Sequence, residues 1–92
     1  SISDIQKNVA EKYSIKLSDL TGKSRKKEFV SPRHIAMYLC RDILDDSLVT
    51  IANSFDRDHT TLMHGIDKIK EQMELDSDFK EEIESIKKSI VE

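Results

Sequence analysis

A stripe of apolar residues spaced four, three and four positions apart constrains this chain more than any other feature. The stripe consists of Leu62, Ile66, Ile69 and Met73. At about 100° per residue, this spacing keeps all four on one narrow side of an α-helix. Thr60, His64 and Asp67 fall on the opposite side. We therefore expect a helix that buries the stripe and exposes a polar face.

Similar spacing recurs along the chain and predicts an all-α fold. The apolar positions of the other expected helices are Ile5, Val9 and Tyr13, then Ile35, Leu39 and Ile43, then Ile51, Ala52 and Phe55, and finally Phe79, Ile83, Ile86 and Ile90. The chain has only two glycines, one proline and no tryptophan, which favours helices over a turn-rich β-sandwich. Its 92 residues are enough for one domain with a modest core, so we expect a single domain over residues 1–92.

Capping residues predict where these helices begin. The expected N-caps are Ser3 or Asp4 for the first helix and Ser77 or Asp78 for the last. Proline loses no hydrogen bond at the first helical position, so Ser31-Pro32 predicts the start of the helix that contains Ile35. Before it, Ser18-Asp19 can cap a single turn. The intervening residues Gly22–Val30 are strongly basic and have no helical apolar spacing, so we expect them to form an exposed loop.

The net charge of −3 conceals an uneven distribution. Residues 23–41 carry +5 from six Lys or Arg and one Glu, whereas residues 71–92 carry −5 from eight acidic and three basic residues. Charge blocks of both signs in a small domain predict a basic face and an acidic face, and a polyanion responds to the local field. An acidic composition therefore does not exclude a nucleic-acid partner.

The cysteine count and the hydropathy bear on where the protein works. Cys40 is the only cysteine, so it cannot form an internal disulfide, and we expect it in the core in a reducing compartment. No apolar run approaches the ~18 residues that a bilayer span requires, and the N-terminus lacks a signal-peptide pattern. We expect a cytoplasmic protein without a membrane span. A chain that begins at serine is also expected to be a piece of a longer one.

Three partial motifs lack residues that their chemistry requires. Gly22-Lys23-Ser24 looks like the end of a P-loop, but Leu17 replaces the necessary glycine and no strand precedes it. Thr61 occupies the position where a calcium loop needs glycine. His59 and His64 lie about 140° apart on a helix, so they cannot bind one zinc ion from one face. We expect no metal, no cofactor and no catalytic site, because a convergent pocket usually needs a larger scaffold.

Residues 47–75 contain the parts of a helix-turn-helix, namely a short helix, a tight turn and a longer helix. The second helix of this motif contacts base edges with its N-terminal residues, which here are Asp58, His59, Thr60 and Thr61. Their carboxylate, imidazole, hydroxyl and methyl groups all suit base edges. Asp58 is equally an ordinary N-cap that would stabilise the helix by ~1 kcal/mol, and His64 could simply be solvated. Nearby cations at residues 23–27 would attract phosphate, and one arginine could enter an A·T-rich minor groove.

The strings "RDHTTLMHG" and "SPRHIAMYL", together with "IQKNVAEKYSIKLSDL", resemble the C-terminal DNA-binding domain of the DnaA family of bacterial chromosomal replication initiators. The resemblance covers essentially the whole chain, and its Arg-Asp-His-Thr-Thr core is specific to the family. It implies a six-helix bundle with a helix-turn-helix, similar to that of the Trp repressor. It also implies binding, as one protomer, to a short asymmetric A·T-rich box in the replication origin. The family's ATPase module is absent from this chain, so the resemblance implies no enzyme here and the other initiator domains as partners in the full-length protein.

The resemblance assigns roles to individual residues. Base contacts are implied for Arg25 in the minor groove and for Asp58, His59, Thr60 and Thr61 in the major groove. Contacts at or near the DNA backbone are implied for Lys23, Lys26, Lys27, Arg33, His34, Arg41, Leu48, Val49, Arg57 and His64. The chain departs from the family at the turn, where a single Asp56 follows Phe55 in place of two small residues, often Gly-Gly. Val49 also replaces a common proline.

A protein-interaction module is the alternative function that the sequence leaves open. In that case the acidic face from Glu71 to Glu84 would be the functional surface. If the chain binds DNA instead, the acidic last helix must point away from the duplex, because like charges would offset the attraction. Salt-dependent and sequence-dependent binding to a duplex distinguishes the two functions.

Overall fold

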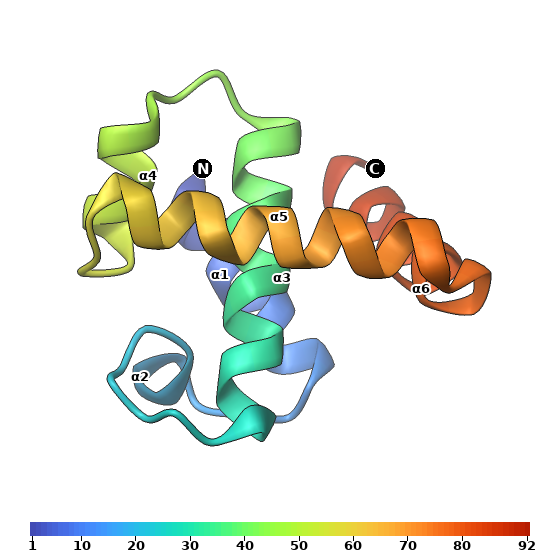
Figure 1. Ribbon diagram of the computed structural model, residues 1–92, viewed down its shortest axis with the longest axis horizontal. Helices are drawn as coiled ribbons and strands as arrows, with labels where there is room; N and C mark the ends of the chain where they lie inside the picture. Colours follow the sequence, from blue (N-terminus) through green and yellow to red (C-terminus); the bar gives the residue numbers. More distant parts are fainter.

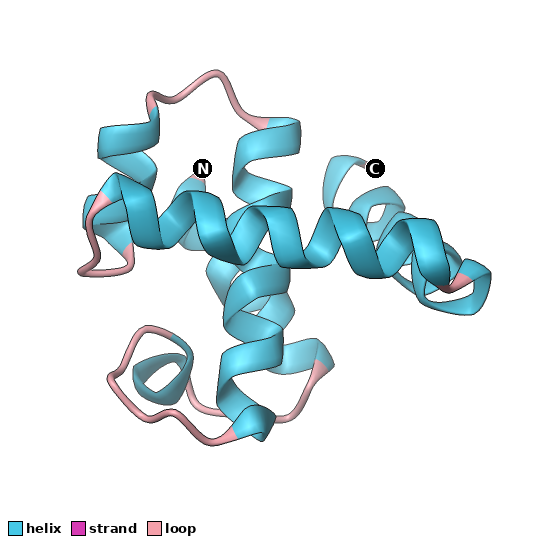
Figure 2. Ribbon diagram, in the orientation of Figure 1, coloured by secondary structure: helices cyan, strands magenta, loops and turns pink.

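The computed structural model describes residues 1–92 and consists of six α-helices without strands, as predicted (Figure 1, Figure 2). The helices are α1 (Ile2–Lys12), α2 (Leu17–Leu20), α3 (Lys27–Ile43), α4 (Leu48–Ser54), α5 (His59–Leu75) and α6 (Ser77–Val91). Its principal extents are 30 × 28 × 25 Å. None of the helices combines the length and the hydrophobicity that crossing a bilayer requires.

The two longest helices, α3 and α5, have 17 residues each and cross at the centre of the molecule (Figure 1). α1 packs behind α3, and α6 packs against α1, α3 and the C-terminal part of α5. An ion pair between Lys87 Nζ and Asp42 Oδ2, 2.8 Å long, also joins α6 to α3. α6 therefore lies at the opposite end of α5 from its first residue, His59.

One apolar core of 17 buried residues draws side chains from all six helices. The predicted stripe on α5 supplies Leu62, Ile66 and Ile69, each at most 2% exposed, while Met73 is half-buried. Cys40 is fully buried, as expected, and burial raises the pKa of its thiol to about 12. α4 and α5 pack on this core with their apolar sides, and the N-terminal residues of α5 remain exposed at the surface.

The start of α3 differs from the prediction. The helix begins at Lys27 rather than near Pro32, so only residues 21–26 form a loop, called the basic loop below. The backbone N–H groups of Phe29 and Val30 both donate to the Lys26 carbonyl, and no side chain caps the helix. Pro32 thus lies inside the helix, where one backbone hydrogen bond is missing because proline has no N–H group. Phe29 and Val30, in the first turn that the sequence did not predict, are half-buried.

Three predicted caps are wrong by a few residues. Ser1 Oγ caps α1 by accepting from Asp4 N at 3.2 Å, and Asp76 Oδ1 caps α6 by accepting from Phe79 N at 3.1 Å. No side chain caps α2, which starts after Lys16. A capping residue must have an extended backbone, and the sequence does not show which residue has it. Because Ser and Asp residues are adjacent at these helix starts, the pattern could not identify which one caps the helix.

Candidate nucleic-acid interface

The N-terminus of α5 displays the predicted base-contacting side chains on the surface. Asp58 Oδ1 accepts a hydrogen bond from Thr61 N at 2.8 Å and so caps the helix, which lowers the pKa of the Asp58 carboxyl. His59, Thr60 and Thr61 are exposed. A carboxylate can accept several hydrogen bonds, so capping leaves Asp58 chemically able to meet a base amino group as well. The helix end also carries a partial positive charge that favours phosphate.

The turn between α4 and α5 is a Schellman motif. Arg57 N donates to Ala52 O and Asp56 N donates to Asn53 O, each at 3.0 Å. Asp56 takes the left-handed position of this motif, with φ 54°, where glycine is the usual residue. A single left-handed residue thereby ends α4 and turns the chain toward α5, so the turn closes with one aspartate where the family pattern has two small residues.

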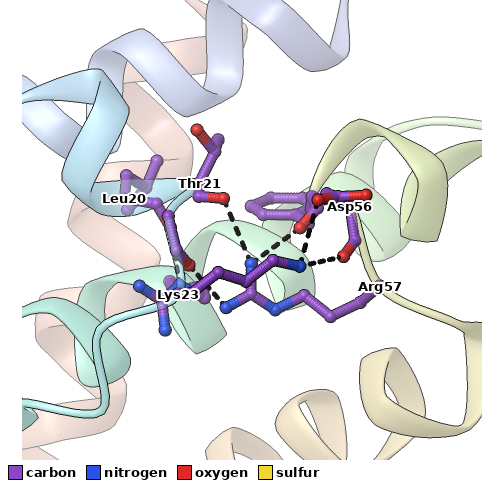
Figure 3. A network of polar contacts seen from close by, with 8 residues as sticks. Leu20, Thr21, Lys23, Asp56 and Arg57 are labelled. Carbon is purple, nitrogen blue, oxygen red and sulfur yellow. Dashed lines mark hydrogen bonds and ion pairs between the residues drawn. The ribbon is translucent and has the colours of Figure 1, made fainter.

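Lys23 of the basic loop contacts this turn directly. Its Nζ lies 3.0 Å from Asp56 Oδ2 and donates to the Asp56 backbone carbonyl at 2.7 Å (Figure 3). Both side chains are largely exposed, so the pair contributes little to stability. Lys23, which was expected at a phosphate, is therefore exposed, but its charge is already paired with the carboxylate of Asp56.

Arg57 makes contacts different from the predicted one. Its Nη1 donates to the carbonyls of Thr21 and Phe55 at 3.1 and 2.7 Å, and its Nη2 donates to the carbonyl of Gly22 at 2.6 Å (Figure 3). The side chain is half-buried between the turn and the basic loop. Arg57 therefore joins these two segments, and its phosphate contact stays a prediction.

Arg33 also has a structural role in place of the expected phosphate contact. It is only 3% exposed, and its three guanidinium nitrogens donate to backbone carbonyls. The bonds run from Nε to Leu20 at 2.6 Å, from Nη1 to Ser24 at 3.0 Å and from Nη2 to Asp19 at 2.9 Å. Burial and the neighbouring Arg57 lower the pKa of the guanidinium. A buried cation with this many acceptors holds the loop on α3 and has almost no exposed surface for a phosphate.

The basic loop itself presents cations outward. Lys23, Arg25 and Lys26 are exposed, and Lys27 is exposed in the first turn of α3. Through Arg57 and Lys23, the first residues of the basic loop lie against the turn that leads into α5. The structure thus joins the start of the loop expected in the minor groove to the segment expected in the major groove.

The remaining predicted backbone contacts differ in exposure. Arg41 and His64 are exposed, as is Val49 at 58%, whereas Leu48 is half-buried at the start of α4. His34 is half-buried, and its pKa is lowered by burial and by the charges of Lys68, Arg33 and Arg57. His34 is consequently neutral at pH 7 and could offer a phosphate only one N–H donor.

Lys68 is a basic residue near this surface that the sequence did not single out. It lies with Lys27, Ser31 and His34 in a shallow hollow between α3 and α5. The helical spacing from His64 to Lys68 is four, which places both on one side of α5, and this spacing was the available signal. The hollow extends the positive surface along the helix crossing.

A short bracing helix, a Schellman turn and a longer helix with a polar, exposed N-terminus define a helix-turn-helix domain, here with a basic loop fixed beside it. A family model described as bacterial dnaA protein helix-turn-helix matches residues 2–69. The chain belongs to this family.

Similar proteins agree with this assignment. The chain is 48% identical over 88 residues to the chromosomal replication initiator protein DnaA of Limosilactobacillus reuteri, covering 95% of this chain and 20% of that protein. It is 45% identical over 93 residues to the protein of the same name from Oenococcus oeni, covering 100% of this chain and 21% of that protein. A crystal structure of a DNA replication initiation factor superposes with a TM-score of 0.88 at 36% identity, covering 97% of this chain and 27% of that one. The chain thus spans about a fifth of the length of these curated relatives.

Proposed function

We propose that this domain binds double-stranded DNA with sequence preference, at A·T-rich boxes of a bacterial replication origin. The N-terminus of α5 enters the major groove and the basic loop enters the adjacent minor groove. The observation that carries the proposal is the joining of these two surfaces through the guanidinium of Arg57. A helix N-terminus and a cationic loop on one face suit a duplex better than a single-stranded or protein partner.

The exposed side chains divide into two groups in this proposal. The base contacts are Arg25, Asp58, His59, Thr60 and Thr61. The residues that contact or lie near phosphates are Lys23, Lys26, Lys27, Arg41 and His64. Leu48 and Val49 place the start of α4 against the DNA backbone. His34 acts as a neutral donor. Contacts of the first group give sequence preference, whereas those of the second give affinity that depends on salt.

The biological setting is also part of the proposal. The domain acts without a catalytic site or cofactor of its own, binds DNA as a monomer in the bacterial cytoplasm, and delivers the other domains of a replication initiator to the origin. The location of α6 at the far end of α5 supports the geometry, because it keeps the −5 block of residues 71–92 away from the duplex.

Fluorescence anisotropy of labelled duplexes tests the proposal. A duplex with an A·T-rich origin box and a scrambled duplex of equal length and composition are titrated at several salt concentrations. We expect tighter binding to the box and, for about five phosphate contacts, a slope of log K against log salt of roughly −4 to −5. Affinity that depends neither on salt nor on sequence would contradict the proposal and favour a protein-interaction module that uses the acidic face.

A further inference from the structure

The basic loop is held by two arginines that come from different parts of the fold. Arg33, on α3, binds the carbonyls of Asp19, Leu20 and Ser24, as described above. Arg57, in the turn before α5, binds the carbonyls of Thr21 and Gly22. Along residues 19–24, the two carbonyls that Arg57 binds lie between those that Arg33 binds. The loop is therefore attached to the body of the domain by Arg33 and to the helix-turn-helix by Arg57.

Arg57 connects the two DNA-facing segments through a single residue. Its backbone N–H closes the Schellman motif on Ala52, and the next residue, Asp58, caps α5. Its guanidinium reaches Thr21 and Gly22, which lie 36 and 35 residues earlier in the chain. These hydrogen bonds fix the start of the basic loop relative to the turn before α5 (Figure 3), and Arg25 follows Gly22 by three residues.

We propose that Arg57 is a positioning residue for DNA recognition, which orders the basic loop before binding so that Arg25 meets the minor groove while α5 occupies the major groove. A loop without regular structure loses conformational freedom when it binds, and a loop already ordered in the free protein loses less. The contribution of Arg25 to affinity therefore depends on the contacts of Arg57. This inference rests on the proposed function.

Arg57→Lys separates positioning from charge. Lysine keeps the positive charge that a phosphate contact would need, but its single ammonium group cannot reproduce the planar donors that reach three carbonyls. Arg41→Lys makes the same chemical change at an exposed cation that does not contact the basic loop. Because Arg41 is itself proposed to contact phosphate, its control is the cost of Arg25→Ala in this background and not its own affinity. Circular dichroism first establishes that each variant is folded.

The test is a double-mutant cycle with Arg25→Ala, measured by anisotropy on the box duplex. We expect Arg25→Ala to weaken binding about tenfold in the unaltered protein and in Arg41→Lys. In Arg57→Lys we expect the same change to weaken binding by less than about threefold, because the loop is no longer ordered in advance.

Gly22→Ala tests the same contact from the other side without changing any charge. A Cβ at position 22 would stand 2.6 Å from the backbone oxygen of Ser18, so the backbone that carries the Gly22 carbonyl must shift, and we expect this to disturb its hydrogen bond from Arg57. We expect Arg25→Ala to lose most of its effect in this background too. Order parameters of the free, unaltered protein add a measurement without any variant: residues 23–25 should be close to about 0.85, the value of rigid backbone.

Each other outcome overturns a specific statement. An equal cost of Arg25→Ala in every background, or order parameters below about 0.6 in the free loop, would show that Arg57 does not position the loop. This conclusion would hold even if Arg57→Lys weakened binding, since a phosphate contact or lower stability would then explain the loss. Failure of the unaltered protein to distinguish the box from the scrambled duplex would instead overturn the proposed function.

Discussion

The imidazole of His34 and the α-carbon of Gly65 face each other where α3 crosses α5. A Cβ at position 65 would lie 2.8 Å from His34 Cδ2 and 3.0 Å from Met37 Sδ. Glycine normally weakens a helix, so its presence in the middle of α5 has a packing reason. The close approach that it permits sets the position of the proposed recognition helix on α3.

Gly65→Ala should lower the free energy of unfolding by about 1–2 kcal/mol, measured by urea denaturation. Overpacking against His34 outweighs the ~1 kcal/mol by which alanine favours a helix. In a His34→Ala background the main clash disappears, so the same substitution should become neutral or stabilising. A destabilisation of equal size in both backgrounds would show that His34 is not the residue that limits the approach.

Stability should fall as the pH is lowered below 6.5 because of His34. Burial and the charges of Lys68, Arg33 and Arg57 lower its pKa in the folded state from the ordinary value of 6.5. Between the lowered pKa and 6.5 the unfolded chain binds more protons than the folded one, so the free energy of unfolding rises with pH across this window and levels off above it.

Thermal melts of His34→Gln from pH 7.5 to pH 5 test this dependence. The variant should lose most of the pH dependence in that range, whereas His64→Gln, which alters an exposed histidine, should retain it. Equal pH profiles for the His34 variant and the unaltered protein would assign the dependence to other groups.

Arg33→Lys should destabilise the domain by about 2–4 kcal/mol in urea denaturation. Lysine can satisfy at most one of the sites that Nε, Nη1 and Nη2 now occupy, and each buried acceptor left unpaired costs ~1–3 kcal/mol. Arg41→Lys, on the exposed side of the same helix, should change stability by less than about 0.5 kcal/mol. If Arg33→Lys left stability unchanged but weakened DNA binding, the original phosphate role would be restored.

The roles of Arg33 and Arg57 show where prediction from the sequence ended. Apolar spacing identified the helices and most of the core, because a buried stripe repeats along one helix and needs no knowledge of its neighbour. The partners of these two arginines are backbone carbonyls 9 to 36 residues away in the chain, apart from the nearby Phe55. Any residue type supplies such a carbonyl, so no residue pattern marks it.

The boundaries of α3 and the turn show the same limit. Lys26 has no capping side chain, so nothing in the sequence marked the true start of α3, whereas Pro32 offered a convincing but wrong one. At Asp56 the sequence is one residue shorter than the family pattern. Only the backbone hydrogen bonds of the Schellman motif show how the shorter turn closes. Of the residues expected at bases, the helical period placed only Thr60 on the polar face, whereas the others came from their position at the start of the helix or, for Arg25, from the family resemblance.

Asp56→Asn should raise the affinity for all duplexes by roughly two- to fivefold at low salt. The substitution removes a negative charge 3.0 Å from Lys23, so that the ammonium keeps its bond to the backbone carbonyl but is no longer neutralised and attracts phosphate more strongly. Asparagine also tolerates the left-handed backbone. The salt slope should steepen by up to about one unit. Because the pair is exposed, stability should change by less than about 0.5 kcal/mol.

Glu81→Gln provides the comparison for Asp56→Asn, since it removes the same charge from the exposed surface of α6, at the far end of α5. Affinity and salt slope should remain close to those of the unaltered protein. A gain in affinity as large as that of Asp56→Asn would mean that net charge alone, rather than the release of Lys23, explains the effect.

His59→Ala and Arg41→Ala should weaken DNA binding in different ways. Removal of His59, at the first position of α5, should cost ~1–3 kcal/mol on the preferred box and much less on a scrambled duplex, because the lost contact is to a base edge. Removal of the exposed Arg41 should weaken both duplexes alike and make the salt slope shallower by about one unit, because the lost contact is to a phosphate. Anisotropy titrations on both duplexes at three salt concentrations measure these effects together. A change in base preference from Arg41→Ala, or an equal loss on both duplexes from His59→Ala, would reverse the assignment of these two residues to phosphate and base.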